Sequence, residues 1–172
     1  MTAASRQPGK WRWAGLFLLI ALPGLLLVWW LGIFNAGLPP LAGRLTFMAV
    51  PVLAAALVGA LWRGTLPARP DWASRRAYSR LMAYLLFAAV TFLLPFAMAV
   101  IALRAEGYAL ADIWPDILGV AGATLPRALP ALFLSITLNF LICLFQTDIG
   151  LSLGVWIRDW MMRASADGTR RD

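Results

Sequence analysis

Four long stretches of the sequence contain no charged side chain, and their length limits the folds that the chain can adopt. An α-helix needs about 20 mostly apolar residues to cross the ~30 Å hydrocarbon core of a bilayer. The stretches therefore predict an all-α membrane protein with four transmembrane helices. We place these helices at residues 13–34, 45–62, 81–103 and 129–147, with polar tails at 1–12 and 164–172, in a single integral membrane domain 1–172.

The composition agrees with a bilayer environment. The chain is 62% hydrophobic and 13% charged, which leaves too few polar side chains to cover a soluble globule. It contains no histidine and a single cysteine, Cys143. A haem, zinc or copper site is therefore not expected, an intrachain disulfide is excluded, and we predict no metal and no cofactor.

The basic residues lie just outside the uncharged stretches, and their distribution predicts an orientation. Twelve of the 15 Lys and Arg residues fall before residue 13, between residues 62 and 81, or after residue 157. Since cytoplasmic loops are enriched in Lys and Arg, both termini are expected in the cytoplasm. The basic residues do not gather on one soluble module, so nucleic-acid binding is not expected despite a net charge of +7.

Two further segments are expected to be helical outside the four spans. Between residues 104 and 127, apolar side chains recur every three or four residues, which predicts a short periplasmic helix lying on the membrane surface. These side chains are Leu110, Ile113, Trp114, Ile117, Leu118 and Ala121. Residues 149–163 form an amphipathic cytoplasmic segment that either prolongs the fourth span or turns along the interface.

The fourth span is set apart by polar side chains at helical spacing. This polar stripe comprises Ser135, Asn139, Cys143 and Gln146, with Asp148 close to the cytoplasmic end. In hydrocarbon it must face protein or trapped water. The stripe either holds helices together through hydrogen bonds or lines a path along which a proton or small solute reaches Asp148. Asp148 can also lie at the cytoplasmic membrane interface, neutralised by Arg158 or by the arginine-rich loop of residues 63–80.

Small residues mark two places where helices can pack closely. Ala55 and Gly59 form a small-xxx-small step in the second span, and Gly150 and Gly154 form a GxxxG step further along the chain. Such steps let helix backbones approach each other. The partner of the GxxxG step is either another helix of this chain or a helix of a partner subunit.

Residues 63–80 are the most charged segment. They contain Arg63, Arg69, Arg75, Arg76 and Arg80 against one acid, Asp71. These arginines either contact anionic lipid headgroups or serve only to fix the orientation. Pro67 and Pro70 interrupt any helix continuing from the second span, and the residues after Pro70 predict the start of the third helix. Pro51 is expected in the first turns of the second span, and Pro95 at a kink in the third.

No catalytic residue can be assigned. The sequence lacks a GxSxG elbow, an HExxH helix and a phosphate-binding glycine loop. The only cluster of acids comprises Glu106, Asp112 and Asp116 in a surface loop, where solvated side chains are the simplest interpretation. We therefore expect a protein without enzymatic activity.

Residues 50–72 carry the closest likeness to a known family. Val50-Pro51-Val52-Leu53-Ala54-Ala55-Ala56, Leu66-Pro67 and Asp71-Trp72 match an alanine-rich second helix and a Pro-acid-Trp approach to the third. In this pattern the chain resembles the ABZJ family of small, functionally uncharacterised four-span proteins of the bacterial inner membrane. The resemblance implies the four-span fold and no particular activity.

Two other families are similar in size. Small multidrug exporters carry an essential glutamate in the first helix, and the first span of this chain has no acid, so we reject that match. The small permease subunit of tripartite periplasmic transporters also has four spans, but no residue motif supports the likeness.

These observations favour an integral protein of the bacterial inner membrane that acts as an accessory or assembly subunit. Its expected partners are the lipid bilayer and either another membrane protein or a second copy of itself. The alternative is a small transporter or permease component with a polar path along the fourth span. A partner pull-down in mild detergent distinguishes the two, since only the first predicts a different protein at fixed stoichiometry.

Overall fold

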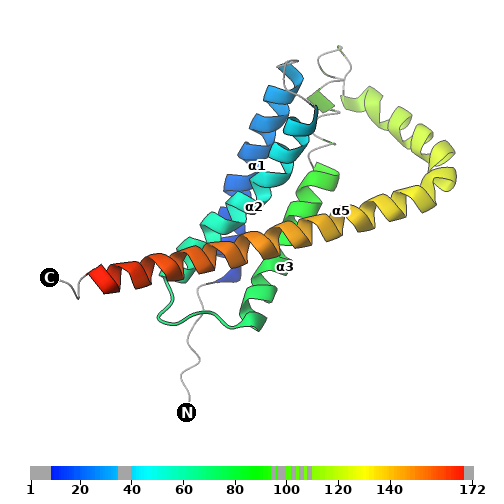
Figure 1. Ribbon diagram of the computed structural model, residues 1–172. Helices are drawn as coiled ribbons and strands as arrows, with labels where there is room; N and C mark the ends of the chain where they lie inside the picture. Colours follow the sequence, from blue (N-terminus) through cyan, green and yellow to red (C-terminus); the bar gives the residue numbers. More distant parts are fainter. Residues whose placement is uncertain are drawn as a thin grey trace. The chain divides into compact units, whose positions relative to one another are not determined.

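The computed structural model describes residues 9–34, 40–93 and 110–168, together with residues 96, 100, 101, 104 and 107. The elements in this part of the chain are α1 (Lys10–Phe34), α2 (Pro40–Gly64), α3 (Trp72–Ala88), η1 (Ala89–Leu93) and α5 (Leu110–Gly168). The described residues contain helices and no strand, which confirms the all-α class (Figure 1).

The chain divides into two compact units. The first unit contains Met1–Leu85 and Cys143–Asp172, and the second contains Leu86–Ile142. Both α3 and α5 therefore begin in one unit and end in the other. The single integral domain expected from the sequence stays a prediction, and each unit is described by itself below.

In the first unit, α1 and α2 pack together through small and apolar faces. The buried side chains of α1 recur every three or four residues, so they lie on one face of the helix. They are Trp13, Ala14, Phe17, Ala21 and Leu25. The matching face of α2 buries Ala54, Ala55, Val58 and Trp62. A Cβ at Gly24 would lie 2.8 Å from Cγ1 of Val50, so the glycine allows the two helices to approach closely.

The start of α3 has a local cause in the sequence. Asp71 precedes the first helical residue, and its Oδ1 accepts a hydrogen bond from the Ser74 N–H at 3.2 Å. This arrangement is an N-cap, which satisfies one of the free amides of the first turn. The helix begins at Trp72, as the residues after Pro70 predict.

α3 changes to the wider π-helix η1 at Ala89. Such segments bend a helix and are uncommon. Pro95, where the sequence predicts a kink, lies outside the described residues. The predicted third span, 81–103, is described continuously only as far as Leu93, so its crossing stays a prediction.

The C-terminal part of α5 passes across α2 and α3 instead of running alongside them (Figure 1). Backbone atoms of the two helices meet there, because Gly150 and Gly154 face Val52 and Ala56 of α2. This crossing lies within the first unit, and the four-helix bundle that the four spans suggest stays a prediction. The small residues explain the crossing, because they allow close contact at one point of each helix.

The ends of α1 and α2 differ from the sequence-based expectation. α1 begins at Lys10, inside the predicted N-terminal tail. α2 begins at Pro40, a residue suited to the first position of a helix because it has no N–H to leave unpaired. Pro51 therefore lies about three turns into α2 and not in its first turns.

The prediction of a separate short helix before the fourth span is wrong. Residues 110–168 form one continuous helix, which includes Pro126 and Pro130 as well as residues 149–163. Apolar helices tolerate internal proline where neighbouring groups can satisfy the freed carbonyls. The predicted C-terminal tail is also helical as far as Gly168.

In the described part of the chain, two helices are long and apolar enough to cross a membrane, judged by length and composition. They are Lys10–Val28 in α1 and Ala128–Ala166 in α5. Met48–Gly64 in α2 is apolar but shorter. In the most apolar stretch of α5, 6% of the residues are buried.

Candidate functional site

The first unit is held together by one face of α5. Side chains at every fourth position of this helix are buried: Cys143, Thr147, Leu151, Val155 and Asp159. Because an α-helix turns by 3.6 residues, a row at intervals of four winds slowly around it. The row therefore meets α3 near Thr147 and α2 near Asp159. We call this row, with its partners on α2 and α3, the α5 seam.

The middle of the α5 seam is a contact between small residues. A Cβ added to Gly59 would lie 2.6 Å from the backbone oxygen of Leu151. One added to Gly150 would lie 2.7 Å from Cβ of Ala55 and would also collide with the backbone of Val52. The structure thus brings the two predicted packing steps together, and the GxxxG step has a partner within this chain.

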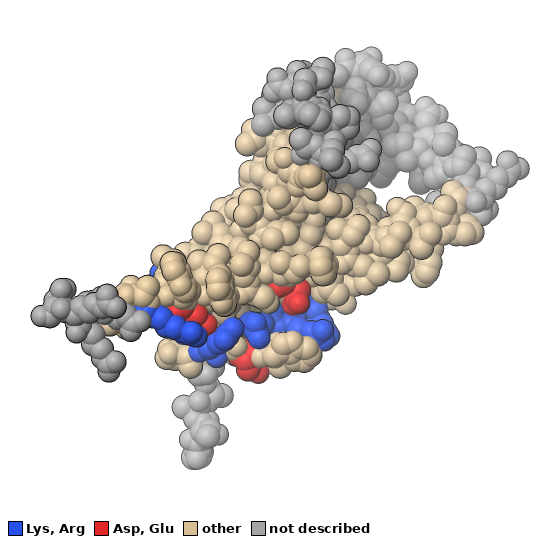
Figure 2. All heavy atoms as spheres, in the orientation of Figure 1, with Lys and Arg blue, Asp and Glu red and all other residues tan. Residues whose placement is uncertain are grey.

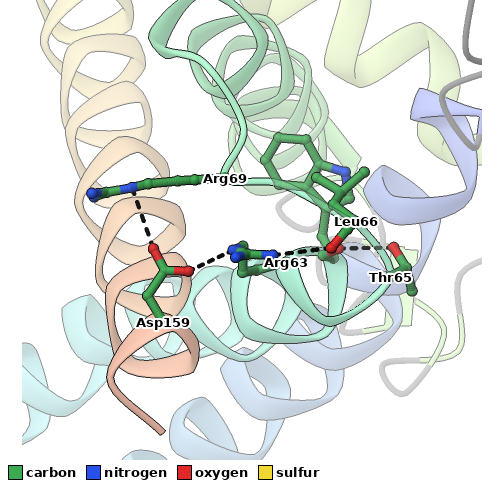
Figure 3. Close-up of polar contacts among 6 residues, drawn as sticks. Arg63, Thr65, Leu66, Arg69 and Asp159 are labelled. Carbon is green, nitrogen blue, oxygen red and sulfur yellow. Dashed lines mark hydrogen bonds and ion pairs between the residues drawn. The ribbon is translucent and has the colours of Figure 1, made fainter. Parts of the chain in front are cut away.

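Asp159 lies at the centre of the polar end of the α5 seam (Figure 3). In the predicted orientation, this end would face the cytoplasm. Arg63 Nε donates to Asp159 Oδ1 at 2.5 Å, and the two side chains are only 11% and 9% exposed. Arg63 Nη1 also donates to the Leu66 carbonyl oxygen at 3.0 Å. One guanidinium therefore joins the end of α2, the following loop and α5.

Arg69 adds a weaker contact to the same carboxylate. Its Nε lies 3.3 Å from Asp159 Oδ2, and its side chain is 53% exposed. Oδ2 has no hydrogen bond of good geometry among the described residues, so Arg69 meets it as an ion pair only. Exposed pairs of this type contribute about 0–1 kcal/mol, much less than a buried pair loses when one partner is removed.

An aromatic pair lies next to this cluster. The rings of Trp62 and Tyr78 stack with centroids 4.4 Å apart and planes 26° apart. Such a pair contributes about 0.5–1.5 kcal/mol beyond its burial. Burial raises the pKa of the Tyr78 phenol. Thr65 closes the end of α2, since its hydroxyl donates to the Trp62 carbonyl oxygen at 2.8 Å.

At its other end the α5 seam contacts α3 through hydroxyl groups. The Ser79 hydroxyl donates to Asp148 Oδ1 at 3.0 Å. In return, the Thr147 hydroxyl lies 3.1 Å from the Ser79 carbonyl oxygen and 2.9 Å from the carbonyl oxygen of Cys143, so it can donate to either. Ser79 and Thr147 are both buried. Asp148 is therefore bonded by a neutral hydroxyl, whereas the basic loop pairs with Asp159.

The predicted polar stripe divides between the two units. In the first unit Cys143 is buried, and Gln146 Nε2 donates to the Met48 carbonyl oxygen at 3.1 Å. In the second unit Asn139 Nδ2 donates to the Thr91 hydroxyl at 2.7 Å. Ser135 is exposed and has no hydrogen-bond partner among the described side chains. Three of the five polar residues thus bond to another helix.

The predicted lipid-binding arginines also have different surroundings. Arg63 and Arg69 pair with Asp159. The guanidinium of Arg76 lies 4.2 Å from the centre of the Trp72 ring, a cation–π contact. Arg75 is half-buried, and its Nε has no partner in the described part of the chain. Arg80 is exposed. On the face drawn in Figure 2, the coloured charged side chains gather along the lower edge of the described residues.

Sequence reasoning missed Asp159, Thr147 and Ser79. Asp159 lies next to Arg158 and four residues before Arg163 in the segment that the sequence predicts to be amphipathic, so its neighbours in the sequence do not indicate burial. Its position in a row at intervals of four with Val155, Leu151 and Thr147 would have indicated burial. Ser79 carries no distinguishing signal in the sequence.

The seam offers ion pairs and hydroxyl–carboxylate bonds, which bind and position helices. Its only cysteine, Cys143, is buried. Among the described residues there is no group of three side chains of His, Cys, Asp or Glu that could hold a metal ion.

No protein-family model, curated protein or solved structure compared with this chain matches it.

Proposed function

We propose that this chain is a four-span protein of the bacterial inner membrane without enzymatic activity, which acts as an accessory or assembly subunit of a larger membrane protein. Both termini lie in the cytoplasm in this proposal, and the α5 seam is the rigid part of the subunit. The bacterial assignment is supported by a composition rich in Arg and Ala and poor in Lys.

One observation carries the proposal: large apolar side chains of α5 are not covered by the described part of the chain. Phe133, Leu134 and Phe145 are 74%, 59% and 68% exposed. Water cannot solvate such a continuous surface without aggregation, because soluble monomers rarely expose large apolar patches. Lipid or another protein must therefore cover it.

Ser135 indicates that a protein, and not lipid alone, contacts the exposed apolar face of α5. Its hydroxyl is exposed between large apolar side chains and has no partner among the described residues. In hydrocarbon a side-chain hydroxyl is more stable against a neighbouring helix than against lipid tails. We therefore place a partner helix against the face of α5 that contains Ser135.

The length of α5 supports a cytoplasmic extension. Its apolar part, Ala128–Ala166, contains 39 residues and is ~58 Å long at ~1.5 Å per residue, more than the ~30 Å hydrocarbon core. Residues 129–147 fill the fourth span in this proposal. The charged residues Arg158, Asp159 and Arg163 then follow on the cytoplasmic side, where the basic edge in Figure 2 meets anionic lipid.

The experiment is a pull-down of the tagged protein from its native membrane in mild detergent. A stoichiometric partner is expected with the wild type and with Leu27→Trp, which adds bulk at an exposed site on α1. Ser135→Trp should lose that partner, since protein interfaces tolerate added bulk less well than lipid does. If the protein is recovered only with further copies of itself, the accessory function is wrong.

Membrane insertion and orientation have their own test. Alkaline carbonate should leave the chain in the membrane fraction. In a Cys143→Ala background, Ala73→Cys should react with an impermeant thiol reagent only after the inner face is opened, and Arg104→Cys should react in intact spheroplasts. Labelling in the opposite pattern would contradict the proposed topology.

A small transporter or permease component is the second candidate, and Asp148 is the observation that favours it. Its carboxylate lies in a membrane-length helix with a single hydrogen bond, from Ser79, and no ion pair among the described residues. Intramembrane carboxylates commonly bind protons or solutes. If Asp148→Asn and Asn139→Leu leave uptake or efflux in proteoliposomes unchanged, this candidate fails.

A further inference from the structure

A groove lies between the polar ends of α1 and α2, away from Asp159. It has a volume of about 490 Å³ and is lined by Arg12, Trp13, Gly15, Leu16, Leu19, Leu61 and Thr65. Its walls are apolar, and both Leu19 and Leu61 face outward, with 72% and 47% of their surface exposed. The groove is therefore open to the surroundings beside Leu19 and Leu61.

The mouth of the groove has a cation that a ligand can reach. Arg12 is exposed, and its guanidinium makes no ion pair or hydrogen bond with any described residue. Trp13 beside it is only 7% exposed, and its indole Nε1 is itself buried. Of these two polar groups, Arg12 is therefore the one that is open to a ligand.

The charged residues on the two helices that line the groove are all basic. The sequence contains no Asp or Glu before Asp71, so neither helix that lines the groove supplies an acid. Lys10 lies one turn of α1 from Trp13 and adds to the positive field. The groove therefore combines a cationic mouth with an apolar channel that begins about one turn deeper.

We propose that this groove binds one anionic glycerophospholipid. The phosphodiester accepts hydrogen bonds from Arg12 at the headgroup level, and one acyl chain lies along Leu16, Leu19 and Leu61. Arg12 and Leu19 are separated by ~10 Å along the helix, which matches the step from headgroup to hydrocarbon. The site differs from the arginine loop, whose Arg63 and Arg69 are occupied by Asp159.

The groove proposal rests on the proposed membrane insertion, and the experiment distinguishes a failure of the groove proposal from a failure of membrane insertion. Purified wild-type protein is examined by native mass spectrometry with phosphatidylglycerol and with phosphatidylcholine of identical acyl chains. One phosphatidylglycerol should remain bound in preference to phosphatidylcholine. Arg12→Gln should weaken this binding about fivefold, as expected for one basic residue at an anionic headgroup. Lys10→Gln removes a neighbouring charge outside the groove and should have a smaller effect.

A second readout locates the acyl chain. Phosphatidylglycerol with a diazirine in its acyl chain should cross-link to peptides containing Leu16, Leu19 or Leu61, and Leu16→Trp, which fills the groove, should abolish those cross-links. Equal binding of the two lipids, equal effects of the two charge variants, or cross-links elsewhere would overturn the groove proposal. So would saturable binding of glycerol 3-phosphate alone, which would indicate a site for a free anion. Release of the protein by carbonate would instead overturn the membrane proposal itself.

Discussion

Arg63 and Asp159 form a nearly buried ion pair between residues 96 positions apart in the sequence, with 2.5 Å between Arg63 Nε and Asp159 Oδ1. The pair fixes the end of α2 against the last turns of α5. Because the same guanidinium bonds the Leu66 carbonyl oxygen, the contact also positions the loop that leads toward α3. The α5 seam thus ends in a bond that couples three segments of the first unit.

Removing one partner of this pair should destabilise the protein strongly. Asp159→Ala leaves the Arg63 guanidinium nearly buried without its counter-charge, and we expect a loss of about 3 kcal/mol in the free energy of unfolding. Arg69→Ala removes the exposed partner of the same carboxylate and should cost less than about 1 kcal/mol. Unfolding of the purified variants in detergent, followed by circular dichroism, measures both. Equal losses would contradict the assigned geometry.

The glycines of the seam provide a second prediction. A Cβ at Gly154 would overlap the backbone of Ala56 and lie 2.8 Å from the Ala60 nitrogen, so Gly154→Ala should force α2 and α5 apart. We expect a destabilisation of about 1–3 kcal/mol, the range seen for overpacked contacts. Gly15→Ala is the matched control, since no atom lies within 4 Å of the new Cβ. It should be neutral or stabilise the helix by up to about 1 kcal/mol.

The length of the uncharged stretches predicts the helical class, because each stretch must satisfy its own backbone hydrogen bonds in a membrane. The spacing of small residues identifies Gly59, Gly150 and Gly154 as packing residues. It does not predict that α5 crosses α2, because the crossing depends on which two small steps meet in space. Asp159 illustrates the same limit: its burial follows from the pairing of helices far apart in the sequence, and its own neighbours resemble a solvated surface.

The N-cap of α3 predicts a local pH dependence. Hydrogen bonds from the Ser74 hydroxyl and then from the Ser74 N–H hold the pKa of Asp71 below its usual value of 3.8. Since the folded pKa is the lower one, the cap is fully present above the unfolded pKa and is lost as the pH falls through the folded pKa. Protection of the Ser74 amide against hydrogen exchange, relative to its intrinsic rate, should therefore decrease below about pH 4. Asp71→Asn keeps a capping oxygen that does not titrate, so its protection should not change with pH.

Asn139 and Ser135 lie one turn apart on α5, and among the described residues Asn139 has a hydrogen-bond partner, the Thr91 hydroxyl at 2.7 Å, whereas Ser135 has none. Asn139→Leu should lower the free energy of unfolding by about 0.6 kcal/mol, the average for a hydrogen bond between membrane helices. Thr91→Val should cost a similar amount, and the double variant should cost less than the sum of the two, because both remove the same bond. Ser135→Ala, measured by the same detergent unfolding, should leave the isolated subunit unchanged. An additive double variant would show that Asn139 and Thr91 do not interact.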